Sequence, residues 1–155
     1  MTYVLEKTQR VPAPLDEVFD FFARPDNLAR ITPGWLDFRI VAPEQRDMRQ
    51  GLEIEYRVRP LLVPQKWVSR ITAYDPPHRF VDEQVHGPYR RWRHLHEFEP
   101  VATGNGAVTE IRDRVDYALP FGPLGRVAHA LLVRRQLESI FEHRRRVIAD
   151  EFGAA

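Results

Sequence analysis

The chain is 155 residues long, which suits one hydrophobic core, and we expect a single domain over residues 1–155. Its 23 Lys and Arg residues against 22 Asp and Glu residues give a net charge of +1, whereas proteins built to bind phosphate backbones carry a strong positive excess. The sequence contains no cysteine, which excludes disulfides, thiol nucleophiles and thiolate-bound metals.

The first predicted elements are one strand and two short helices. Residues Tyr3–Val11 alternate and include β-branched and aromatic side chains, which favours a strand, and two prolines end it. Residues Asp16–Ala23 then predict a helix whose apolar stripe holds Val18, Phe19 and Phe22. Asp26 is predicted to cap a second short helix, which runs through Arg30 and ends before Thr32-Pro33-Gly34.

From Trp35 to Pro120 the hydrophobic pattern has a period of two residues, which is typical of strands. Breakers interrupt it at Gly51, Pro64, Pro76-Pro77, Gly87-Pro88 and Gly104-Asn105-Gly106. Five or six consecutive strands with short connections predict an antiparallel meander, so the sheet has six or seven strands in all.

The last predicted element is one long helix over residues 124–152, where Gly125 is the single glycine and no proline occurs. Its apolar stripe is predicted to face the sheet and holds Leu124, Val127, Ala128, Leu131, Leu137, Ile140, Phe141 and Ile148. The basic run Arg144–Arg146 is predicted to be a solvated face, balanced by nearby acids.

This order of elements predicts an α+β fold in which a curved antiparallel sheet wraps around the C-terminal helix. An open sheet of this size twists and curls, and one helix laid in its concave face cannot fill the enclosed volume. We therefore expect a cavity between the sheet and the helix.

Three local strings carry a resemblance to a known family. They are residues 80–84 (FVDEQ) leading into Gly87-Pro88-Tyr89, residues 92–98 (WRHLHEF), and residues 113–117 (DRVDY) before residues 120–125 (PFGPLG). With the order of elements, they make the whole chain resemble the START-like (SRPBCC) ligand-binding superfamily, and within it a bacterial branch described only as ligand-binding. The resemblance implies a helix-grip fold that holds lipids, sterols, quinones, polyketides or plant hormones, and a minority of members that catalyse cyclisation or dehydration.

Strand parity predicts which side chains face the cavity, because charged residues should collect on the wet face. In residues 80–85 the two parities compete, and the resemblance favours Phe80, Asp82 and Gln84 over Val81, Glu83 and Val85. The candidate ligand-binding residues are Tyr56, Trp67, Phe80, Asp82, Gln84, Trp92, His94, His96, Asp113 and Tyr117. This set is too polar for a dry core, so its members must pair with one another, hold water or meet a ligand.

Within this set, Asp82, His94 and Asp113 are predicted to lie nearly in one row across three neighbouring strands. Such a row could orient a ligand hydroxyl or carbonyl, or move a proton. The simpler alternatives are a hydrogen-bonded histidine pair, and ion pairs of the two acids with strand arginines such as Arg91, Arg112 or Arg114. The aromatic residues could equally be plain core.

A metal site made of His94 and His96 with Asp113 or His86 is sterically feasible, but no further histidine pattern supports it, so we expect no metal. Phosphate-binding strings such as Gly-x-Gly-x-x-Gly are absent from the sequence, and no cofactor is expected. The first ten residues are too charged for a secretory signal, and no apolar run reaches the roughly 18 residues of a span, so we expect a cytoplasmic protein with no membrane span.

These patterns predict that the protein binds or carries a small hydrophobic molecule, such as a lipid, a quinone or a polyketide, in the cavity. The alternative is an enzyme of the cyclase or dehydratase type, with His94 as acid or base and Asp82 or Asp113 as its partner. Nucleic acid is not an expected partner, because alternation in residues 89–93 (YRRWR) separates the arginines from Trp92. A protein partner is left unknown, with the arginine-rich C-terminal helix as the candidate surface.

Overall fold

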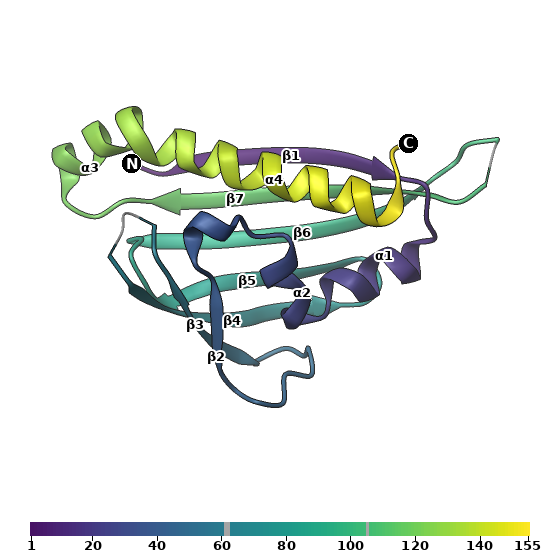
Figure 1. The fold of residues 1–155 in the computed structure, drawn as a ribbon, viewed down its shortest axis with the longest axis horizontal. Coiled ribbons are helices and arrows are strands. Elements are labelled where there is room, and N and C mark those ends of the chain that lie inside the picture. Colours follow the sequence, from purple (N-terminus) through teal and green to yellow (C-terminus); the bar gives the residue numbers. More distant parts are fainter. Residues whose placement is uncertain (61–62, 105) are drawn as a thin grey trace.

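Seven strands pair in one antiparallel sheet of order β1-β7-β6-β5-β4-β3-β2 (Figure 1). The computed structural model describes residues 1–60, 63–104 and 106–155, so the predicted breaker Asn105 lies outside the described residues. The strands are β1 (Tyr3–Val11), β2 (Arg39–Ala42), β3 (Glu53–Val58), β4 (Gln65–Asp75), β5 (Arg79–His86), β6 (Arg91–Val101) and β7 (Val108–Ala118). The predicted sheet is confirmed, and β1 forms one of its edges by pairing with β7.

Turn chemistry fixes the register of the β5–β6 hairpin. Between β5 and β6, the Gln84 side chain donates to the Tyr89 carbonyl oxygen at 2.7 Å and accepts from the Tyr89 backbone N–H at 3.1 Å. Gly87 lies under this bridge, where a Cβ would overlap the Gln84 amide. A larger residue at this position would have to displace the Gln84 amide from its hydrogen bonds, so the turn favours glycine. The turn places Asp82 opposite His94 across the β5–β6 pair.

Two short helices follow β1, as predicted. Helix α1 (Leu15–Phe22) carries Asp16 and Glu17 in its first turn, where the helix dipole favours acids. It buries Val18, Phe19 and Phe22, and Phe19 packs edge-on against Phe98 of β6 at 5.4 Å between ring centroids. Helix α2 (Pro25–Arg30) and the 3₁₀ turn η1 (Gly34–Leu36) then lead to the edge strand β2.

The C-terminal helical run crosses the sheet beside β1 and β7 (Figure 1). It consists of α3 (Gly122–Ala128), the π-helical turn η2 (His129–Val133) and α4 (Arg134–Phe152), with right-handed helical backbone at both junctions. In the second half, Leu137, Phe141 and Ile148 are buried, as predicted.

The predicted stripe is wrong in the first half of this run. Leu124, Val127 and Leu131 are 75%, 57% and 69% exposed, and Ala128 is also exposed. The inward positions are instead Gly125 and His129. Two contacts fix this face. Gly125 lies so close to the Pro120 carbonyl that a Cβ would overlap it, and His129 Nε2 lies 2.7 Å from the Tyr117 hydroxyl of β7.

Candidate functional site

A cavity of about 190 Å³ lies between the sheet, helices α1 and α2, and α4. Its walls are mainly apolar. Helix α2 contributes Leu28, strand β3 contributes Ile54 and Val58, and helix α4 contributes Leu137 and Ile140. The curled sheet is thus closed on one side by the helices, and the remaining space is lined by side chains from elements far apart in the sequence.

Seven of the ten predicted site residues line this cavity: Tyr56, Trp67, Phe80, Asp82, Trp92, His94 and His96. The other three do not line it. Gln84 is engaged in the β5–β6 turn, Tyr117 contacts His129 beneath the start of the helical run, and Asp113 lies behind the two histidines. On β5 both Phe80 and Val81 are buried, and Phe80 with Asp82 is on the cavity side.

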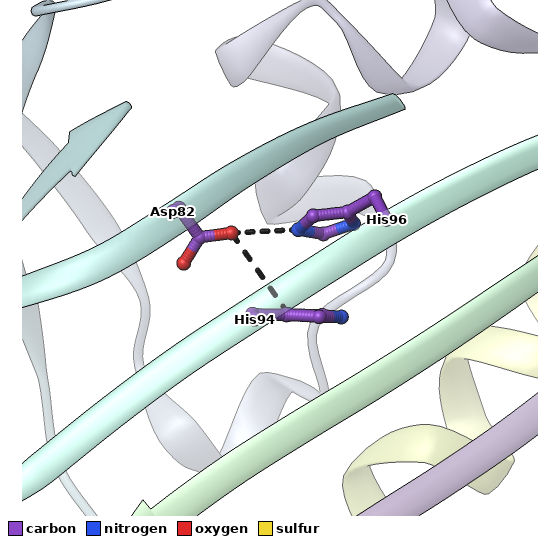
Figure 2. A group of neighbouring side chains, drawn as sticks. All are labelled: Asp82, His94 and His96. Carbon is purple, nitrogen blue, oxygen red and sulfur yellow. Dashed lines mark hydrogen bonds and ion pairs between the residues drawn. The ribbon is translucent and has the colours of Figure 1, made fainter. Parts of the chain in front are cut away.

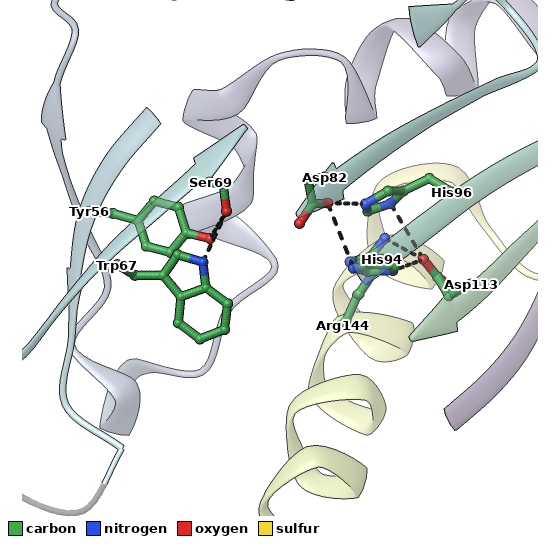
Figure 3. A network of polar contacts seen from close by, with 8 residues as sticks. All are labelled: Tyr56, Trp67, Ser69, Asp82, His94, His96, Asp113 and Arg144. Carbon is green, nitrogen blue, oxygen red and sulfur yellow. Dashed lines mark hydrogen bonds and ion pairs between the residues drawn. The ribbon is translucent and has the colours of Figure 1, made fainter. Parts of the chain in front are cut away.

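One polar group of the cavity is a trio on β3 and β4 (Figure 3). Tyr56 Oη lies 2.8 Å from Ser69 Oγ, and Trp67 Nε1 donates to the same Ser69 oxygen at 2.9 Å. Burial raises the pKa of Tyr56, and the charge on Asp82 raises it further, so the phenol keeps its proton. The trio therefore places uncharged hydroxyl groups in the wall of the cavity, where they can form hydrogen bonds with a ligand.

The second polar group is a cluster of two histidines and two aspartates on β5, β6 and β7 (Figures 2 and 3). The His96 Nε2–Asp82 Oδ2 distance is 2.6 Å and the His94 Nε2–Asp113 Oδ1 distance is 2.8 Å. The two imidazole rings stack with centroids 3.6 Å apart. In the predicted row, Asp82 does lie opposite His94, with His94 Nδ1 3.9 Å from Asp82 Oδ2. Asp113 lies opposite His96 instead and reaches diagonally to His94, so only this third member departs from the row.

Arg144 completes the cluster, and its predicted place on a solvated face is wrong. The residue is 6% exposed, and its Nη2 donates to Asp113 Oδ1 at 3.0 Å. The guanidinium also lies 5.1 Å from the ring centroid of Phe22. Spacing could have revealed it, because Leu137, Phe141, Arg144 and Ile148 recur every three or four residues on one helical face. The ion pair with Asp113 therefore comes from the helix rather than from the strand arginines considered above.

Burial and charge act against each other on these groups. Burial raises the pKa of Asp113, but the charge on Arg144 and the hydrogen bond from His94 outweigh it, so the pKa lies well below its usual range. Burial likewise raises the pKa of Asp82, and His96, His94 and Arg144 outweigh this effect and lower that pKa. Burial and the neighbouring His94 lower the pKa of His96 to about 4. At neutral pH both acids are therefore charged and His96 is neutral.

Two buried nitrogens of the cluster lack a hydrogen-bond partner among the described residues, His96 Nδ1 and Arg144 Nε. His96 Nδ1 lies 3.5 Å from Asp113 Oδ1, and the two form an ion pair only when the ring is protonated. The cluster is thus highly connected but incompletely satisfied, which is a feature of sites that bind or react rather than of a plain core.

Potential metal-ligand atoms of Asp82, His94 and His96 lie within 4.8 Å of one another. Each Nε2 atom is already engaged by a carboxylate, and the rings are stacked at an interplanar angle of 25°, so their in-plane lone pairs do not converge on a common point. Arg144 adds a positive charge beside Asp113. The arrangement fits a hydrogen-bonded cluster better than a cation site.

A second, polar pocket of about 200 Å³ lies on the other side of the cluster. It is lined by Lys7, Thr8, Gln9, Asp113, Phe141, Glu142, Arg144 and Arg145. Phe141 and Arg144 line both pockets, whereas Asp82 and the two histidines line only the apolar cavity. The cluster therefore separates an apolar compartment from a polar one and bridges them through ring nitrogens and carboxylates, the groups that move protons.

The seven-stranded curved sheet, the short helices after β1 and the long C-terminal helical run define a helix-grip α+β protein of the START-like class. Residues 11–141 match the family described as polyketide cyclase/dehydrase and lipid transport, and the chain belongs to this family. Ligand binding in the general sense is therefore its family-level role. No helix among the described residues has both the length and the apolar character needed to cross a membrane.

Solved structures share the fold at low sequence identity. A Thermus thermophilus protein is 17% identical with a TM-score of 0.68, and the match covers 96% of this chain and 99% of the other. A START superfamily protein from Mycobacterium smegmatis is 11% identical, with a TM-score of 0.68 and 96% of each chain covered. Truncated norcoclaurine synthase from Thalictrum flavum is 14% identical with a TM-score of 0.66, and 96% of this chain and 94% of the other are covered. No curated protein matches this chain by sequence.

Proposed function

We propose that this protein binds or carries a small hydrophobic molecule, of the size of a quinone, a polyketide or a short lipid, in the cavity between the sheet and α4. The observation that carries the proposal is an apolar cavity of about 190 Å³ with buried polar groups in its wall. An engineered apolar cavity of roughly 150 Å³ is enough to hold benzene. The volume here therefore suits a ligand with at least one ring, held by a single START-like domain over residues 1–155.

The polar groups indicate what such a ligand carries. Tyr56, Trp67 and Ser69 have three hydroxyl or N–H hydrogens but only two hydrogen bonds among themselves, so one hydroxyl hydrogen is left to donate. On the neighbouring strand, Asp82 uses Oδ2 for His96. Its charged carboxylate can accept from a ligand hydroxyl. A ring with oxygen substituents on both edges satisfies both groups.

The test is a titration with N-phenyl-1-naphthylamine, a neutral apolar probe, followed by energy transfer from the tryptophans, two of which line the cavity. Ile140→Trp places a larger side chain in the cavity and should weaken probe binding roughly tenfold or more. Ser139→Trp is the matched control, because Ser139 is the adjacent exposed position of the same helix and does not line the cavity. Equal affinity of the two variants for the probe would contradict the proposal, provided that both keep the wild-type melting temperature.

A second candidate function is an enzyme of the cyclase or dehydratase type that uses the histidine cluster. The supporting observation is that His94 and His96 line the cavity while each is hydrogen-bonded to a carboxylate. Product analysis in the same titrations, with hydroxylated aromatic or polyketide-like compounds in place of the probe, separates it from pure binding. Catalysis requires turnover that His94→Gln abolishes while affinity is kept, and binding alone predicts no product with either protein.

A further inference from the structure

The helical run that closes the cavity carries an unpartnered apolar stripe on its outer side. Phe121, Leu124, Val127 and Leu131 recur every three or four residues and are 80%, 75%, 57% and 69% exposed. Leu132 beside them is 42% exposed. We call these five residues the outer stripe. Scattered exposed apolar residues are ordinary on protein surfaces, but a continuous row on one helix marks a surface that meets an apolar partner.

The charged residues within the segment that carries the outer stripe, residues 122–136, have one sign. Arg126, Arg134 and Arg135 are exposed on the same helical run, and residues 122–136 contain no Asp or Glu. The chain as a whole is nearly neutral, with a net charge of +1, so this concentration of positive charge is local. A helix segment with large apolar side chains on one side and arginines beside them is the pattern of a segment that lies in a membrane interface.

The outer stripe also lies at the end of the molecule where the cavity is lined by loops. Pro60 after β3, Pro88 and Tyr89 before β6, and Gln136 in the first turn of α4 all line the cavity. In Figure 1 these connections lie at the same end as α3 and the N-terminus. The Gln136 side chain is hydrogen-bonded to the Pro60 carbonyl, which joins the helical run to the β3–β4 loop at this end.

We propose that the outer stripe docks this protein on the surface of a membrane that contains anionic lipids. Phe121, Leu124, Val127 and Leu131 enter the boundary between headgroups and acyl chains, while the three arginines contact lipid phosphates. In this orientation the loop-lined end of the cavity faces the bilayer, from which an apolar ligand is exchanged. Docking stands independently of the proposed function, and only the exchange of ligand rests on it.

A second copy of the chain fits the outer stripe less well. In a two-fold dimer the same patch meets itself, so the three arginines of each copy would face one another without an acid between residues 122 and 136 to compensate them. A stable dimer also needs roughly 800 Å² of buried surface from each partner, more than five side chains on one helix supply. Anionic phosphate complements the arginines directly.

The test is flotation of the full chain with vesicles of phosphatidylcholine alone and of phosphatidylcholine with one quarter phosphatidylglycerol. The protein should float with the anionic vesicles and much less with the neutral ones, and 0.5 M NaCl should release it. Each arginine near an anionic surface contributes roughly fivefold to binding, so Arg126→Gln with Arg134→Gln should weaken it by more than tenfold. Leu124→Gln with Leu131→Gln should do the same without changing the charge.

Val41→Gln is the matched control, because Val41 is an apolar residue of β2 that is 50% exposed outside the outer stripe, and it should float like the wild type. Ile140→Trp, which fills the cavity, should also float normally, whereas Leu124→Gln with Leu131→Gln should keep its affinity for the naphthylamine probe. A failure of docking and a failure of ligand binding are thus separated. The proposal is overturned if the wild type does not float with anionic vesicles, if the leucine variant floats equally well, or if mass measurements show a dimer that the leucine variant abolishes.

Discussion

Asp113 is the residue on which the buried cluster depends. Its Oδ1 accepts from His94 on β6 and from Arg144 on α4, so one carboxylate oxygen joins the sheet to the helix. Removing one partner of a buried charged pair leaves the other uncompensated, which typically costs several kcal/mol. The same contacts keep the carboxylate ionised beside an apolar cavity, where an isolated charge would be neutralised.

The low pKa of His96 makes stability depend on pH. An unfolded histidine titrates near 6.5 and the folded one near 4, so between these values the unfolded chain binds more protons and the free energy of unfolding falls as the pH falls. The lowered pKa values of Asp82 and Asp113 act in the same direction at lower pH. Urea unfolding between pH 7 and pH 4 should show this decline.

His96→Gln should flatten the decline between pH 6.5 and pH 4, because the titrating group is gone. His78→Gln is the control, since His78 is exposed in the β4–β5 turn, and it should follow the wild-type curve. A decline that persists unchanged in His96→Gln would show that another group carries the pH dependence.

At the scale of elements, the helical run is divided by its π turn. Gly125 before the turn, His129 at its first position, and Leu137 and Phe141 after it all face inward, at intervals that are multiples of four residues. An α-helix has 3.6 residues per turn, so an uninterrupted helix would drift off this line, and the wider π turn restores it. The aligned inward row leaves the apolar residues of α3 outside as the outer stripe.

Gly125→Ala tests how this face is chosen. The added Cβ would overlap the Pro120 carbonyl, which is backbone and cannot rotate away, so we expect a loss of roughly 1–3 kcal/mol in the free energy of unfolding. Gly34→Ala is the control, because nothing lies within 4 Å of a Cβ there, and it should be close to neutral. Urea unfolding of both variants is the measurement, and an equal effect of the two would contradict the steric argument.

At the scale of the whole molecule, the buried apolar side chains of the described residues form three clusters that surround the cavity. One is centred on α1 and Phe98, one on β3 and β4, and one on Tyr117 with α4. The cavity is lined by members of all three clusters, including Phe80, Trp67 and Leu137. Because the void lies where the clusters would otherwise merge, a ligand that fills it completes the packing.

This arrangement predicts strong thermal stabilisation by a bound apolar ligand. At a concentration 100 times its Kd, a ligand adds about 2.7 kcal/mol, which for a domain of this size raises the melting temperature by roughly 5–10 °C. Melting curves with and without N-phenyl-1-naphthylamine are the measurement, at one concentration for all proteins. Ser139→Trp should shift like the wild type and Ile140→Trp much less, and an equal shift in both would place the probe outside the cavity.

The sequence by itself determined the sheet, the two short helices and the parity of the strands, except in residues 80–85, where the pattern was ambiguous and the family resemblance favoured Phe80 and Asp82. Alternation between apolar and charged residues, and Gly or Pro at the turns, are local properties, so Trp92, His94 and His96 could be assigned to one face before any fold was known. The aromatic and acidic residues gathered around them follow from the same local rule.

Tertiary structure decided which face of the C-terminal helical run turns inward. It thereby buried Arg144 and left Leu124 and Leu131 exposed. It also decided that Gln84 serves a turn and that Asp113 reaches diagonally to His94. These outcomes depend on how elements pack in three dimensions, as in the contact of Arg144 on α4 with Asp113 on β7, and on the close approach of Gly125 to the Pro120 carbonyl just before α3. Tertiary structure also decided the volume of the cavity. This volume is the space left after all side chains have packed, and no local sequence pattern determines it.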